Sequence, residues 1–77
     1  MTIFHQEPAA CRVWTEKRTV FIELHDGRFF GFPASRFRRL RHAADEELAE
    51  AKIEVNGFAL RWGKLDEDIM VPGIVNG

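Results

Sequence analysis

Three consecutive acids, Asp66, Glu67 and Asp68, form the densest group of side chains that could hold a hard cation. Carboxylate oxygens are the ligands that Mg²⁺ and Ca²⁺ prefer, but adjacent residues on an extended chain point to alternate sides. The run also lacks the central glycine and the terminal glutamate of a twelve-residue calcium loop. We therefore expect no metal site, and we interpret these acids as ion-paired within the chain or as part of a partner-binding edge.

Histidines and nucleophiles are scattered along the chain. His5, His25 and His42 show no His-x-x-x-His or Glu-x-x-His spacing, so no two ligands share one helix face. Cys11 and Ser35 have no histidine and orienting acid in a recognised local motif. The six glycines are dispersed among turns, which excludes a glycine-rich phosphate loop. The sequence thus predicts no catalytic residue, no cofactor and no enzymatic activity.

A basic run between positions 36 and 41 is the other concentration of charge. On a helix, Phe37 and Leu40 would point inward, and Arg38 and Arg39 would point most directly away from them. Four acids follow between positions 45 and 50, whereas a phosphate-binding face needs few acidic neighbours. We expect this basic face to be solvated or paired within the chain, and contact with a protein or a nucleic acid is the alternative.

The length of 77 residues allows one domain, whose core must be compact. Seven Phe and two Trp within a 45% hydrophobic composition predict a folded chain. A single cysteine excludes an internal disulfide, and no stretch has the apolar length of a signal peptide or a membrane span. These features predict a cytoplasmic protein without membrane contact, with residues 1–9 flexible or loosely packed.

Two glycine-containing turns indicate hairpins. A three-residue loop that ends at Gly27 would place apolar residues of both flanking strands on one face. Those residues are Val20, Ile22, Leu24, Phe30 and Phe32. At Asn56-Gly57 a two-residue type I′ turn would group a second apolar set. This set is Ile53, Val55, Phe58, Leu60 and Trp62.

The remaining elements complete an α+β fold. A strand through Cys11, Val13 and Thr15, which turns at 16–18, would make a three-stranded meander with the first hairpin. Short helices are expected at 35–41 and at 45–52, the second capped by Asp45. The C-terminal hairpin would then be followed by a short final strand at 69–71.

Aromatic side chains are predicted on the second face of the first sheet. In the register above, Trp14, Phe21 and Phe29 lie opposite the apolar set. Unless a helix covers this face, it exposes an aromatic patch edged by Arg12, Glu23 and Arg28, which suits a protein interface.

The C-terminal run 60–75 resembles the signature of domain-of-unknown-function family 2442. The chain has Leu-Arg-Trp-Gly-Lys-Leu-Asp-Glu-Asp-Ile-Met-Val-Pro-Gly-Ile-Val here, and the family typically has Ile-His-Trp-Pro-x-Leu-Asp-Glu-Asp-Ile-x-Val-x-Gly-Leu-Leu. Segments 24–28 and 37–40 and Pro33 are also similar to that family, so the resemblance covers roughly 10–77. Three positions depart from the family pattern. Gly63 stands where the family usually has Pro, Arg61 where it often has His, and Ala44-Asp45 where it commonly has a Thr-Pro helix start.

The resemblance implies a small prokaryotic or phage protein without an established activity. Some family members are encoded beside another small domain of unknown function in a proposed toxin and antitoxin pair. We therefore expect a non-catalytic, antitoxin-like regulator that binds a protein partner stoichiometrically, and a homodimer is possible. One alternative is a phage or mobile-element inhibitor of a host defence complex, anti-CRISPR-like, whose acidic surface competes with nucleic acid. Another is a small nucleic-acid-binding module that uses the 36–41 helix.

The expected partner-binding residues come from the aromatic, basic and acidic groups above. They are Trp14, Phe21, Phe29, Arg38, Arg39, Asp66, Glu67 and Asp68.

Overall fold

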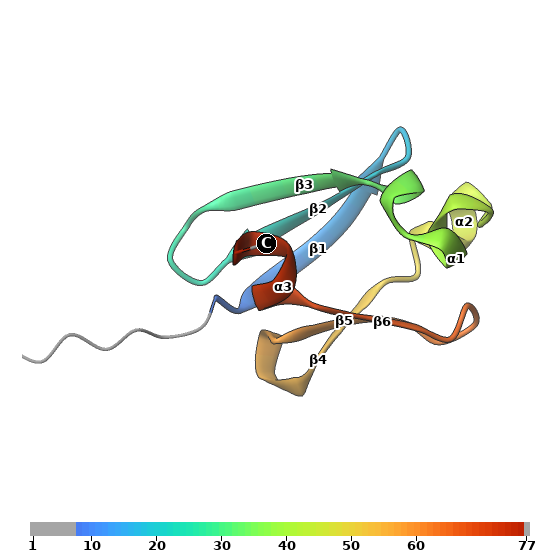
Figure 1. Cartoon of the computed structure of the whole chain (residues 1–77). Coiled ribbons are helices and arrows are strands. Elements are labelled where there is room, and N and C mark those ends of the chain that lie inside the picture. Colours follow the sequence, from blue (N-terminus) through green and yellow to red (C-terminus); the bar gives the residue numbers. More distant parts are fainter. Residues whose placement is uncertain (1–7, 77) are drawn as a thin grey trace, which may run out of the picture.

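The computed structural model describes residues 8–76 and shows two small antiparallel sheets joined by short helices (Figure 1). The elements in chain order are β1 (Ala10–Glu16), β2 (Thr19–Leu24), β3 (Phe29–Pro33), η1 (Ala34–Arg36), α1 (Arg38–Arg41), α2 (Asp45–Leu48), β4 (Lys52–Glu54), η2 (Val55–Gly57), β5 (Ala59–Trp62), β6 (Glu67–Met70) and α3 (Val71–Asn76). The first sheet has the order β1-β2-β3 and the second β4-β5-β6. This confirms the predicted α+β fold, a three-stranded meander followed by short helices and a C-terminal hairpin with a final strand. Of the segment expected to be loose, residues 1–7 lie outside the described residues.

The first sheet has the predicted register. Ile22 pairs with Phe30 and Val20 with Phe32, so the apolar side chains of β2 and β3 share one face. The Leu24 amide donates to the Arg28 carbonyl at 2.8 Å, which leaves a three-residue loop closed by Gly27 at φ +91°. A glycine suits this left-handed position because it has no Cβ to clash with the backbone.

The second hairpin has the predicted turn but not all of the predicted face. Asn56 and Gly57 have φ of +55° and +95°, and the Phe58 amide donates to the Val55 carbonyl at 3.0 Å, as in a type I′ turn. Ile53 pairs with Leu60, as expected. The prediction that Val55 joins the apolar face is wrong, because its own φ of +54° turns the chain early and leaves the residue 63% exposed.

The helix expected at 35–41 is broken into two turns. Phe37 has an extended backbone, with φ −115° and ψ 129°, between η1 and α1. The break lets the Phe37 ring pack edge-on against Phe32, with ring centres 5.4 Å apart, while Leu40 is buried one turn later. Tertiary packing of one aromatic ring therefore overrides the local preference for a continuous helix.

The second helix is shorter than predicted and is capped differently. It ends at Leu48, and Lys52 belongs to β4 instead. Asp45 is not the N-cap: Ala44 occupies that position, and its amide donates to the Glu47 carboxylate at 2.8 Å. At the other end of the chain, β6 stops at Met70, and the unpredicted α3 begins at Val71.

Both sheets contribute to one hydrophobic core. Its largest member is Trp62, which is 1% exposed and donates its indole N–H to the Leu48 carbonyl at 3.0 Å. This confirms the prediction that Trp62 is a core residue. The sheets also meet at Gly57, where a Cβ would lie 2.5 Å from the Ala10 carbonyl oxygen. No helix within residues 8–76 is long and apolar enough to cross a membrane.

Arg18 links the first sheet to the helical segment, a role that the sequence did not predict. It lies in the β1–β2 turn, and its guanidinium donates to three backbone carbonyls at 2.8 to 3.2 Å. The acceptors are Leu40, Arg41 and Ala43. The same group pairs with the Asp45 carboxylate at 2.9 Å. One side chain thus satisfies carbonyls at the end of α1 and reaches the start of α2.

Candidate functional site

The outer face of the first sheet brings together three aromatic side chains, Trp14, Phe21 and Phe29, which we call the aromatic face. Trp14 pairs with Phe21 across β1 and β2, and their rings stack with centres 5.6 Å apart at an angle of 19°. Phe29 meets Trp14 edge-on at 6.1 Å and 79°. Offset stacked and edge-to-face rings are the favoured arrangements of aromatic pairs. The predicted group therefore forms, and it comes from all three strands.

The aromatic face is accessible to a partner. Phe29 is 58% exposed, and Trp14 and Phe21 are half-buried. Gly31 lies opposite Phe21 in the neighbouring strand, and a Cβ there would come 2.9 Å from the Phe21 ring. The lack of a side chain at Gly31 therefore gives the Phe21 ring room on this face.

Two of the three charged residues predicted at the margin of this face are found there. The Arg12 guanidinium lies 4.4 Å from the centre of the Trp14 ring, and its Nε is 3.2 Å from the Glu23 carboxylate. Arg28 instead bonds to Asp26 at 2.8 Å and lies 5.7 Å from the centre of the Phe30 ring. The margin of the aromatic face is consequently close to electrically neutral.

The basic run does not form a single positive surface. Arg39 pairs with the Asp66 carboxylate at 3.6 Å and also donates to the Asp66 carbonyl. Arg41 donates to the Ser35 carbonyl at 3.2 Å, and Arg36 lies 5.8 Å from the centre of the Phe37 ring. Arg38 is exposed.

Arg38 makes no side-chain hydrogen bond or ion pair to other residues in the described range 8–76. The helical break at Phe37 and these separate contacts therefore divide the predicted basic face.

The acidic cluster is largely paired with arginines. Asp68 accepts hydrogen bonds from Arg61 at 2.7 and 2.8 Å, and this side-chain hydrogen bond raises the pKa of Arg61. Asp66 lies 3.7 Å from the same guanidinium, and Glu67 is half-buried. Within residues 8–76 no three histidine, cysteine or acidic side chains gather as a metal site would require.

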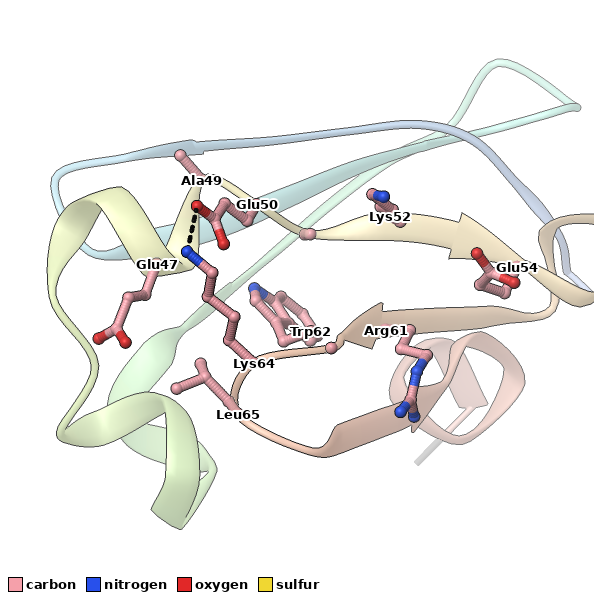
Figure 2. Close-up of a pocket in the computed structure, with 11 residues that line it drawn as sticks. Glu47, Ala49, Glu50, Lys52, Glu54, Arg61, Trp62, Lys64 and Leu65 are labelled. Carbon is pink, nitrogen blue, oxygen red and sulfur yellow. Dashed lines mark hydrogen bonds and ion pairs between the residues drawn. The ribbon is translucent and has the colours of Figure 1, made fainter.

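A groove of about 630 Å³ lies over α2, β4 and β5 (Figure 2). Trp62 lies at the floor of the groove. At one side of the groove, the Lys64 Nζ lies 3.5 Å from the Glu50 carboxylate. Arg61 and Glu54 stand further along the same groove. Acidic and basic side chains both line this open hollow, and its lining within residues 8–76 contains no serine, threonine, cysteine or histidine.

The other residues considered for chemistry stay apart. His25 and His42 are exposed in separate turns, Ser35 is exposed in η1, and Cys11 is exposed in β1. His5 lies outside the described residues. The structure therefore joins the aromatic residues into one surface, and it joins the basic and acidic candidates to each other through Arg39 and Asp66.

Comparisons with known proteins identify relatives of unknown function. The chain is similar to a crystal structure of a protein of unknown function from Rhodospirillum rubrum, with 31% identity and a TM-score of 0.87 over 94% of this chain and 89% of that one. No curated protein matches the chain. The model of the family described as protein of unknown function (DUF2442) matches residues 10–77, and the chain belongs to this family.

Proposed function

We propose that the protein is a non-catalytic regulator that binds a protein partner stoichiometrically through the aromatic face. The observation that supports this is the exposed cluster of Trp14, Phe21 and Phe29, in which one ring is more than half accessible. Aromatic residues dominate the energetics of protein interfaces, because each removes a large apolar area from water with little loss of conformational entropy.

The charges around the aromatic face favour a protein over a nucleic acid. Platforms that stack bases combine aromatic rings with a positive groove that follows the phosphates. Here Arg12 is paired with Glu23, and Arg28 with Asp26. A phosphate backbone on this face would have to compete with the Glu23 carboxylate for Arg12, and Arg28, which lies away from the face, is held by Asp26.

The ion pairs also weaken the two alternative functions. An acidic inhibitor that imitates nucleic acid needs free carboxylates, whereas Asp66 and Asp68 contact Arg39 and Arg61. A nucleic-acid-binding module would rely on the segment 36–41, which offers Arg38 but no continuous basic helix.

We further propose that the partner is a toxin and that the protein masks it in the cytoplasm as an antitoxin. The support for this part is association alone, because some members of the family are encoded beside another small domain in a proposed toxin and antitoxin pair.

Capture from the native host with a matched pair of variants tests the proposed surface. Phe29→Ser removes an exposed apolar side chain from the aromatic face, and Met70→Ser removes one of similar exposure, 53%, from the second sheet. We expect a protein that co-purifies at a one-to-one ratio with the native chain and with Met70→Ser, but is reduced at least tenfold with Phe29→Ser. Nuclease treatment should leave its recovery unchanged.

Three outcomes would contradict the proposal: no stoichiometric protein, equal recovery with both variants, or recovery that nuclease abolishes. If the captured protein stops growth when it is expressed alone, and the native chain but not Phe29→Ser restores growth, the antitoxin role is supported. A captured protein without such an effect contradicts the toxin part and leaves the binding surface intact.

A further inference from the structure

The β3 strand lies at an open edge of the first sheet. It pairs with β2 on one side, and within residues 8–76 no strand pairs with its other side. Figure 1 shows β3 at the margin of the molecule. The opposite edge, β1, packs beside β4. The β3 edge is therefore the less crowded place at which a further strand could join the first sheet.

The pairing of β3 with β2 determines which backbone groups face outward. In an antiparallel pair, residues alternate between those that exchange hydrogen bonds with the neighbour and those whose N–H and C=O point away. The bond from Leu24 to Arg28 sets this alternation, and Phe30 and Phe32 then bond inward to β2. The backbone groups of Phe29 and Gly31 consequently point outward, together with the Pro33 carbonyl.

This edge carries none of the charged residues that normally protect an open strand. Proteins prevent unwanted pairing with charged residues, prolines or bulges along the edge, or by keeping the edge strand very short. The β3 strand is Phe-Phe-Gly-Phe-Pro, and its terminal proline lacks only a donor.

We propose that two copies of the chain pair antiparallel along β3, across a twofold axis at Gly31, and so form one six-stranded sheet. Each Gly31 amide donates to the Gly31 carbonyl of the second copy, and each Phe29 amide donates to the Pro33 carbonyl of the second copy. The proline is compatible with this register, because only its carbonyl is used.

The strand is self-complementary in this register. Phe29 faces Pro33 of the second copy on the outer side, and Phe30 faces Phe32 of the second copy on the inner side. No like charges oppose each other within the strand, and paired glycines at the axis leave room for the Phe21 ring that lies over each Gly31. A second copy therefore fits this edge better than a strand that carries charges.

Edge pairing leaves the aromatic face uncovered and joins two such faces into one surface. The Phe21 rings of both copies would border the joint, with Trp14 and Phe29 of each copy on the same side of the sheet. The dimer does not depend on the proposed function, since its assembly needs no other protein. It would, however, present two aromatic faces to a partner at once.

Sedimentation equilibrium of the purified chain, with a pair of isosteric substitutions, tests the register. Gly31→Asp and Gly31→Asn both require the Phe21 ring to shift, but only the first opposes two negative charges at the axis. We expect the native chain to dimerise reversibly. Dimerisation of Gly31→Asp should be about tenfold weaker than that of Gly31→Asn, because like charges directly opposite on paired strands repel.

Disulfide trapping gives an independent measure of the same geometry. Hydrogen-bonded antiparallel residues have Cα atoms about 5.5 Å apart, which is within the range of a disulfide. In a Cys11→Ser background, Gly31→Cys should form a covalent dimer under mild oxidation. The control Gly63→Cys, at an exposed glycine with open space around its Cβ position, should stay monomeric under the same conditions.

Hydrogen exchange of the unmodified chain covers the case in which position 31 does not tolerate substitution. Protection of the Phe29 and Gly31 amides should rise with protein concentration. A chain that remains monomeric at millimolar concentration overturns the proposal, as does equal dimerisation of the Asp and Asn variants. Faster cross-linking at Gly63 than at Gly31, or protection independent of concentration, would overturn it too.

Discussion

The outer faces of the two sheets differ in their cross-strand pairs: one carries paired charges and the other carries stacked aromatic rings. On the second sheet, Arg61 pairs with Asp68 from the neighbouring strand, so the charges of that face bind each other. On the first sheet, the corresponding cross-strand pair is Trp14 with Phe21, two rings that remain partly exposed to water. Exposed ion pairs contribute little to stability and keep a face soluble, whereas exposed rings retain an apolar area that a partner can cover. The first sheet is therefore the better candidate for binding.

The two tryptophans give the largest expected contrast between the sheets. Trp62→Ala should lower the free energy of unfolding by about 3–5 kcal/mol, because it empties part of the core and leaves the Leu48 carbonyl without its donor. Trp14→Ala should cost only about 1 kcal/mol, mainly through lost aromatic contacts. Urea denaturation followed by circular dichroism measures both. Equal losses would mean that Trp14 is as structural as Trp62 and would weaken the proposed surface.

A comparison of two equally exposed arginines separates the stabilisation that comes from hydrogen bonds to backbone carbonyls from that of ion pairs. The side chains of Arg18 and Arg61 are each 41% exposed. Arg18→Ala should cost about 1–2 kcal/mol after allowance for solvent screening, because it leaves carbonyls at the end of α1 without a donor. Arg61→Ala should cost less, since water and salt can replace its exposed carboxylate contacts. Thermal melts at low and high salt check this. As salt increases, only the Arg61 variant should approach the melting temperature of the native chain.

The hairpin loops of the two sheets should respond to substitution with opposite signs. Gly27→Ala should destabilise the protein by about 1 kcal/mol, because φ of +91° strains any residue with a Cβ. Val55→Gly should stabilise it by roughly 0.5–1 kcal/mol, because a β-branched residue at φ +54° is strained and its side chain is exposed. Chemical denaturation of both variants compares the two loops directly. Destabilisation by Val55→Gly would show that the exposed valine makes a favourable contact.

The smallest expected effect is the pH dependence of the first hairpin loop. Hydrogen bonds from the Arg28 amide and then the Arg28 side chain lower the pKa of Asp26. The native carboxyl therefore binds protons less readily than the unfolded one, so its stabilisation is present above about pH 4 and is lost as pH falls through the lowered pKa. An NMR titration of the Asp26 carboxyl should give a midpoint below the ordinary value, and Arg28→Ala should raise it only part of the way, because the amide of residue 28 still donates to the carboxylate. A native midpoint at or above the ordinary value would contradict this effect.

Much of the fold could be predicted from the sequence where side-chain alternation and turn chemistry agree. The register between Ile22 and Phe30 followed from placing the apolar residues of both strands on one face around Gly27. The turn at Asn56-Gly57 followed from the tolerance of these two residues for positive φ. The helical segment was harder to predict, because four-residue helices have almost no local stability and take their shape from tertiary contacts such as Phe37 on Phe32. The positive φ of Val55 had no local signal at all.

The candidate site was predictable in part for the same reason. Strand alternation was sufficient to place Trp14, Phe21 and Phe29 on one surface. Alternation could not show that Arg39 reaches Asp66, or that Arg28 turns toward Asp26, because side-chain pairing depends on how loops approach in space. Arg18 was missed because its acceptors are backbone carbonyls more than 20 residues away, which leave no trace in residue type.

The contacts of Arg18 have a consequence for the order in which the chain acquires structure. The turns α1 and α2 are too short to form alone, and the side chain that binds carbonyls of α1 and the Asp45 carboxylate of α2 comes from the loop between β1 and β2. The contacts that Arg18 makes with the segment between the two sheets can therefore form only once that loop has brought the side chain into place. The N-terminal meander, whose strands are all close in sequence, is the element that can assemble first and then guide the rest of the chain.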